Sequence, residues 1–60
     1  MMTPHEVAER LRIRVELLYK WKHAGRGPRW IKLGGRYLRY RSSDVEAWLE
    51  HEAQTSGYWR

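Results

Sequence analysis

Two consecutive glycines, Gly34-Gly35, constrain the fold of this 60-residue chain more than any other feature of its sequence. They lie between alternating apolar residues of the segment 30–40. Glycine readily adopts the positive φ angles that a two-residue hairpin turn requires. The segment is therefore predicted to form a β-hairpin in which a two-residue turn places Leu33 opposite Arg36.

This register divides the hairpin side chains between two faces, because successive side chains of a strand point to opposite sides. One face is apolar and suits a hydrophobic core. The other face is aromatic and cationic and carries no carboxylate. The predicted apolar face consists of Ile31, Leu33, Leu38 and Tyr40, and the predicted cationic face consists of Trp30, Lys32, Tyr37 and Arg39.

The charges are distributed unevenly along the chain. Of the 12 Lys and Arg residues, eleven lie between Arg10 and Arg41, where the one acidic residue is Glu16. A basic middle between acidic ends suits a polyanionic partner. We therefore interpret the cationic hairpin as a wing that contacts nucleic acid. The alternatives are a two-stranded cap with solvated cations and, for the basic region, a membrane lipid or an acidic protein as partner.

The first helix is predicted to begin at Thr3-Pro4 and to end near Leu11. Thr3 is a good N-cap, Pro4 lacks the donor that the first turn would leave unpaired, and Glu6 completes a capping box. The expected buried stripe consists of Val7, Ala8 and Leu11.

A second helix is predicted over residues 15–24, with Gly25 as its left-handed terminator. The spacing i, i+1, i+4 predicts a buried stripe of Leu17, Leu18 and Trp21, which leaves Glu16, Tyr19, Lys20 and His23 outward. Two short helices with a tight connection have the proportions of a helix-turn-helix, whose second helix enters the major groove of DNA. The alternative is a plain helical hairpin with a solvated outer face.

A third helix is predicted to begin at Ser43, with Ser43 as N-cap, Glu46 as its capping-box partner and Asp44 at the positive helix end. Its expected buried stripe is Val45, Trp48 and Leu49. The predicted order is helix, helix, β-hairpin, helix, which is a mainly helical winged helix-turn-helix.

The predicted domain covers residues 1–53, and an aromatic tail covers residues 54–60. Large exposed aromatic side chains usually mark a contact. We expect Tyr58 and Trp59 either to fold back or fray, or to dock on a neighbouring copy in a head-to-tail self-association.

Several classes of function lack the residues that they need. There is no cysteine, and His5, His23 and His51 have no neighbours at metal-ligand spacing, so no metal or other cofactor is expected. No glycine-rich phosphate loop occurs, and no paired carboxylates lie near the one obvious cleft-forming element, so the chain is not expected to be an enzyme. No apolar run approaches the roughly 18 residues of a membrane span, and the first residues resemble no signal peptide. A soluble cytoplasmic protein is therefore expected.

The hairpin and third-helix residues carry a resemblance to a known family. Gly27-Pro28-Arg29-Trp30-Ile31-Lys32-Leu33-Gly34-Gly35-Arg36, then Leu38-Arg39-Tyr40-Arg41 and Ser43-Asp44-Val45-Glu46-Ala47-Trp48-Leu49, resemble the small MerR-like winged-helix proteins of the phage excisionase or regulator type. Thr3-Pro4, Glu6-Val7-Ala8 and Leu18-Tyr19-Lys20-Trp21 match the first two helices of that family, so the resemblance covers about residues 3–50.

This resemblance implies that the second helix binds the major groove and that the wing contacts the backbone or the minor groove. It also implies one of two functions: assisting a phage integrase in excisive recombination, or regulating transcription. Sixty residues leave no room for the effector domain of a MerR-type activator, which favours the excisionase. The chain departs from the family at Arg14, where Ser or Thr usually caps the second helix, and at Leu17, where a small Thr is usual.

The expected function is thus sequence-specific binding and bending of double-stranded DNA. The candidate major-groove residues are Glu16, Tyr19 and Lys20, the candidate phosphate contacts are Arg14, Lys22, Lys32 and Arg39, and Arg36 is the candidate minor-groove residue. This expectation requires that the second helix and the hairpin form one continuous positive surface. A single-stranded nucleic-acid binder and a protein-interaction module with an acidic partner remain alternatives.

Overall fold

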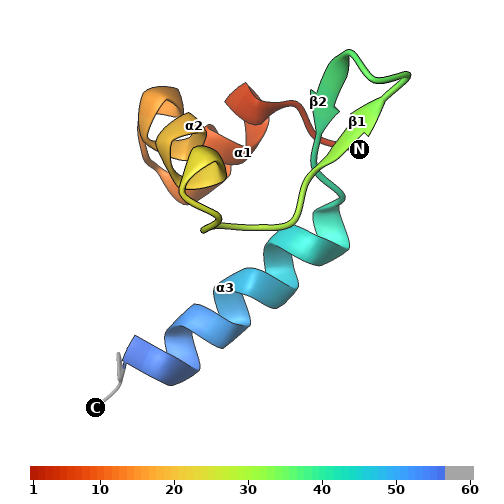
Figure 1. Cartoon of the computed structure of the whole chain (residues 1–60). Helices are drawn as coiled ribbons and strands as arrows, with labels where there is room; N and C mark the ends of the chain where they lie inside the picture. Colours follow the sequence, from red (N-terminus) through yellow and green to blue (C-terminus); the bar gives the residue numbers. More distant parts are fainter. Residues whose placement is uncertain (57–60) are drawn as a thin grey trace.

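The structure, a computed structural model, describes residues 1–56. Its elements are α1 (Pro4–Leu11), α2 (Val15–His23), β1 (Ile31–Leu33), β2 (Tyr37–Arg39) and α3 (Ser42–Ser56). α1 and α2 pack together beside the hairpin, and α3 leads away from both (Figure 1). This confirms the predicted winged helix-turn-helix order. The predicted self-association residues Tyr58 and Trp59 lie outside the described residues.

The start of α1 follows from its capping residues. The Glu6 backbone N–H donates to Thr3 Oγ1 at 3.1 Å, and the Thr3 backbone N–H donates to Glu6 Oε1 at 2.8 Å. This reciprocal capping box satisfies two backbone donors that would otherwise lack partners. The predicted start and the predicted end at Leu11 are both confirmed.

A left-handed residue makes the tight turn between α1 and α2. Arg12 has a φ of 59°, and the Ile13 backbone N–H then donates back to the Ala8 carbonyl at 3.0 Å. Glycine usually occupies such a position, because a Cβ is sterically unfavourable there. Arg14, the N-cap of α2, is extended and makes no side-chain capping bond.

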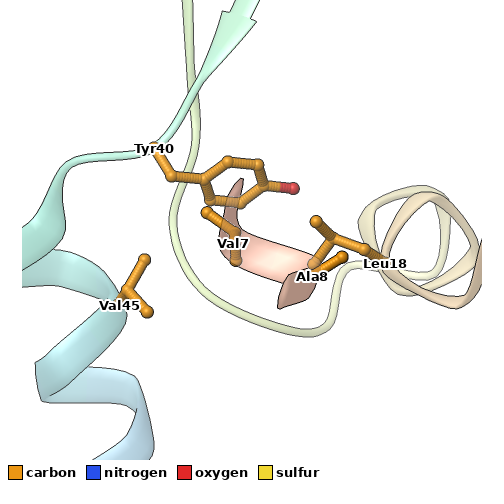
Figure 2. Packing of buried hydrophobic residues seen from close by; sticks show 5 residues of the cluster. All are labelled: Val7, Ala8, Leu18, Tyr40 and Val45. Carbon is orange, nitrogen blue, oxygen red and sulfur yellow. The ribbon is translucent and has the colours of Figure 1, made fainter. Parts of the chain in front are cut away.

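One small core joins the three helices to the second strand of the hairpin. Its fully buried large side chains are Val7 from α1, Leu18 from α2, Tyr40 after β2 and Val45 from α3. Figure 2 shows the Tyr40 ring above Val7, with its hydroxyl directed toward the helix that carries Leu18. Burial, followed by the proximity of Tyr19, raises the pKa of the Tyr40 phenol above 10.0.

The predicted stripe of α2 is correct only in part. Leu18 is buried and Trp21 is half-buried against the core, but Leu17 is 37% exposed. The helix contacts the core along a narrow line, because the domain has a single small layer of buried residues. Leu17 therefore belongs to the outward face of α2.

The hairpin register differs from the prediction by one residue. Leu33 pairs with Tyr37, Lys32 with Leu38 and Ile31 with Arg39, so the loop contains Arg36 as well as the two glycines. The Arg36 backbone N–H still donates to the Leu33 carbonyl at 3.0 Å, as in a tight turn. The second strand thus has one extra residue, Arg36, which pairs with no residue of β1. An extra residue of this kind in one strand is a β-bulge.

This shift exchanges the two faces of β2 relative to β1, because a one-residue change of register moves every side chain to the other side. The predicted apolar and cationic faces are therefore wrong. The observed faces are Ile31, Leu33, Tyr37 and Arg39 on one side, and Lys32 with Leu38 on the other. The reason lies in the core, which takes Leu38 and Tyr40 from the second half of the hairpin and no side chain of β1.

The start of α3 also differs from the prediction. The helix begins at Ser42, so Ser43 is inside it rather than at its N-cap. The Asp44 backbone N–H donates to the Arg41 carbonyl at 3.0 Å, and Arg41 Nε donates to Asp44 Oδ2 at 2.8 Å. Glu46, the predicted capping partner, instead forms an ion pair with Arg10 of α1 at 3.0 Å.

Two half-buried tryptophans join α2 to α3. The ring centroids of Trp21 and Trp48 are 5.5 Å apart, with the ring planes inclined at 47°. Gly27, with a φ of 84°, packs against Trp21, and an added Cβ would lie 3.3 Å from Trp21 Cε3. The loop after α2 can thus pack directly against Trp21, because the contacting residue, Gly27, has no side chain.

We predict that Arg12→Gly stabilises the domain. The substitution relieves the left-handed strain of about 1–2 kcal/mol and loses about 0.5–1 kcal/mol to the greater freedom of the unfolded chain. A thermal unfolding scan should show an increase in Tm of a few degrees. Arg29→Gly is the matched control and should lower the Tm, since Arg29 is exposed and has no positive φ to relieve. A Tm of Arg12→Gly below wild type would contradict the strain argument.

We predict that Gly27→Ala destabilises the domain more than Gly34→Ala does. Both positions have positive φ, so each alanine costs about 1–2 kcal/mol of backbone strain. The Cβ at position 27 also meets Trp21, whereas position 34 has no atom within 4 Å. Urea unfolding of the two variants measures the difference. Equal losses would show that the contact with Trp21 adds nothing.

Candidate nucleic-acid interface

The outward face of α2 carries exposed side chains of mixed chemistry. Glu16 and Lys20 are exposed, Tyr19 is 38% exposed, and Leu17 adds an apolar contact surface beside them. A shallow depression of about 460 Å³ lies where this face meets the turn after α1. It is lined by Arg12, Ile13, Arg14, Glu16, Leu17 and Lys20. The structure thus brings three of the predicted contacts, Arg14, Glu16 and Lys20, to one place.

A direct contact links α2 to the hairpin. Lys22 Nζ lies 4.5 Å from the centroid of the Trp30 ring, within the range of a cation–π interaction. Lys22 belongs to the last turn of α2, and Trp30 immediately precedes β1. This pair therefore connects the last turn of α2 to the residue that leads into the hairpin.

The wing has its own cluster of aromatic and cationic side chains. Two guanidinium groups lie near the Tyr37 ring, with the Cζ atoms of Arg36 and Arg39 at 5.6 and 5.7 Å from its centroid. Arg39 is further held by a hydrogen bond from Nη1 to the Leu38 carbonyl at 2.7 Å. Lys32 was predicted to share a face with Arg39. The observed register places it on the opposite face of the hairpin.

Ion pairing separates the basic residues into two groups. Arg10 and Arg41, at the ends of the basic region, pair with Glu46 and Asp44 of α3. Within residues 1–56, the nine basic side chains between them form no ion pair within 4 Å. These nine are Arg12, Arg14, Lys20, Lys22, Arg26, Arg29, Lys32, Arg36 and Arg39.

The exposed large hydrophobic side chains occupy the same segments as these cations. Apart from Met1, those in the described part of the chain are Leu17, Tyr19, Trp30, Leu33 and Tyr37. All five belong to α2, to the residue that leads into β1, or to the hairpin. A surface that combines free cations with exposed aromatic and apolar groups can bind the phosphates and also the bases of a nucleic acid.

Sequence reasoning missed two residues of this surface, Leu17 and Leu33, because it assigned both to the core. For Leu33 the missing information was the bulge at Arg36, which no local sequence signal indicates. For Leu17 a signal existed, since a small Thr is usual at this position in the family that the sequence resembles.

Two other kinds of site were tested on residues 1–56. No three His, Asp or Glu side chains gather closely enough to hold a metal ion. No helix in this part of the chain has both the length and the apolar character needed to cross a membrane.

The comparisons with known proteins agree with the geometry of the fold. A family model described as a helix-turn-helix domain matches residues 1–53, which include α1, α2, the hairpin and most of α3. No curated protein and no solved structure matches the chain significantly. Because the match covers most of the sequence, the chain belongs to the helix-turn-helix domain family, whose members bind DNA and typically are not enzymes.

Proposed function

We propose that this protein binds specific sites in double-stranded DNA, bends them, and thereby helps an integrase to excise phage DNA in the cytoplasm of a bacterial host. The single observation that supports DNA binding most is the position of the nine free cations. They lie on α2, on the turns beside it and on the wing, and the Lys22–Trp30 contact joins the helix to the hairpin. The proposed function involves no catalytic step and no cofactor.

The helix α2 is assigned to the major groove, which is wide enough to admit a helix. Glu16, Tyr19 and Lys20 would read base edges, while Arg14 and Lys22 would contact phosphates on either side. Glutamate accepts from the amino group of cytosine, and lysine donates to guanine. The exposed Leu17 adds a group suited to the methyl of thymine.

The wing is assigned to the adjacent minor groove. A groove has a phosphate backbone on each side, and the hairpin carries Lys32 on one face and Arg39 on the other. The corrected register therefore still allows both residues to contact phosphates, one on each strand of the duplex. Arg36, the bulged residue next to the tip, would enter the groove, where arginine is attracted by the negative potential.

The excisionase role is supported by the family resemblance of the hairpin and third helix. A small transcriptional regulator would use the same surface. A single-stranded nucleic-acid binder would use the exposed rings of Trp30 and Tyr37, which are 41% and 54% exposed. The experiments below separate these alternatives.

We predict that Arg36→Ala weakens binding and lowers the salt dependence. Sites are first selected from a random duplex library, and affinity is then measured by gel shift at several salt concentrations. Each lost phosphate contact changes the slope of log K against log salt by about one unit. Arg10→Ala is the matched control, since Arg10 is already paired with Glu46, and its slope should equal that of wild type.

Two results would contradict binding to double-stranded DNA. Tighter binding of either single strand than of the selected duplex would favour the single-stranded alternative. Binding that stays flat from low to moderate salt would exclude phosphate contacts.

We predict that deleting the gene in its source cell abolishes excision of the DNA element that carries it. Quantitative PCR of the empty chromosomal junction measures excision. The wild-type chain should restore the junction product, whereas Lys20→Ala combined with Arg36→Ala should not. Unchanged junction product, together with altered transcripts beside the selected sites, would identify a transcriptional regulator instead.

A further inference from the structure

The face of the hairpin that the shifted register turns outward carries an apolar pair close to the tip. Leu33 and Tyr37 are direct cross-strand partners, and they are 42% and 54% exposed. Neither side chain packs against the core. The fold gives no structural reason for these two side chains to be apolar, and exposed apolar surface of this kind marks a contact with a partner.

The tip beyond this pair is narrow. Gly34 and Gly35 have φ angles of 59° and 72°, and no atom lies within 4 Å of the position where a Cβ would be in either residue. Leu33 is therefore the last side chain of β1 before a tip that consists of bare backbone. Such a tip can approach the floor of a groove that is only about 6 Å wide.

Cations surround the apolar pair. The guanidinium groups of Arg36 and Arg39 both lie within 6 Å of the Tyr37 ring centroid, at 5.6 and 5.7 Å, and no residue from Ile31 to Arg39 is acidic. A partner for this patch must combine negative charge at its edges with apolar, stackable surface inside. A DNA duplex can offer this combination, since phosphates line the groove and the apolar faces of the bases become accessible where one base step is unstacked.

We propose that Leu33 is a wedge that enters the minor groove of the bound duplex and separates one base step, with Tyr37 supporting it from the neighbouring strand. Proteins that insert an apolar side chain in this way partly unstack the step and kink the duplex. Arg36 enters the groove beside the wedge, and Arg39 holds a flanking phosphate. The inference rests on the proposed function and adds the residue that produces the bend.

The test measures bending and unstacking separately from affinity. The probe is a selected duplex with a donor and an acceptor dye at its ends, and a second series of duplexes carries 2-aminopurine at successive positions of the wing half-site. Saturating wild-type protein should raise the energy transfer and should raise the 2-aminopurine fluorescence at one step. Leu33→Ala should lose the fluorescence increase and most of the energy-transfer change, while its affinity falls by less than tenfold.

Two variants act as controls. Leu33→Met keeps a long apolar side chain and should retain both signals. Leu17→Ala removes a leucine of similar exposure from α2, so it should change affinity and sequence preference while the bend persists. Circular dichroism confirms that each variant is folded.

The outcomes are distinguishable. If wild type binds no duplex, the proposed function fails. If wild type binds but no step shows unstacking, or if Leu33→Ala bends DNA as wild type does, the wedge is wrong while DNA binding stands. Complete loss of binding by folded Leu33→Ala also overturns the proposal, because the untouched cations would still hold a duplex.

Discussion

The position of the wing depends on one buried side chain, Tyr40. Its ring lies above Val7 in the buried cluster that also contains Ala8, Leu18 and Val45 (Figure 2). Its backbone is also fixed, because Met2 and Tyr40 exchange two hydrogen bonds of 2.7 and 2.8 Å. A domain of this size buries only about 60% of its unfolded surface, so it cannot anchor both strands of the hairpin. It anchors the second strand and leaves the first free of the core.

The side chains that the wing exposes follow from the attachment of only its second strand to the core. Because β1 contributes no side chain to the core, burial does not dictate its register against β2. Arg36 can therefore be accommodated as an extra residue, and the apolar side chain of Leu33 turns outward beside Tyr37. In a larger domain the same leucine would be expected to close a second core layer. Here, under the function that we propose, a nucleic acid covers the exposed side instead.

The sequence allowed the element order, the capping box of α1 and the glycine turns to be predicted, because each depends on residues within a few positions of one another. The register of the hairpin could not be predicted, since it depends on which side of β2 meets helices that are distant in sequence. The exposure of Leu17 could not be predicted because it also depends on distant residues. The spacing i, i+1, i+4 indicates an apolar stripe, but it does not indicate whether other elements bury every residue of that stripe. The start of α3 was misassigned because the Arg41–Asp44 ion pair replaced the serine cap.

The arrangement of charge explains why the exposed apolar groups and the cations occur together. The acidic residues of α3 neutralise the two ends of the basic region, Arg10 and Arg41, so that region's unpaired charge is confined to α2, its flanking turns and the wing. Cations that served only solubility would not need aromatic neighbours, and they would be mixed with carboxylates. Lys22 lies instead over Trp30, and Arg36 lies beside Tyr37. Rings that hold the cations in place reduce the side-chain entropy lost on binding a phosphate, and their exposed faces remain available to the bases.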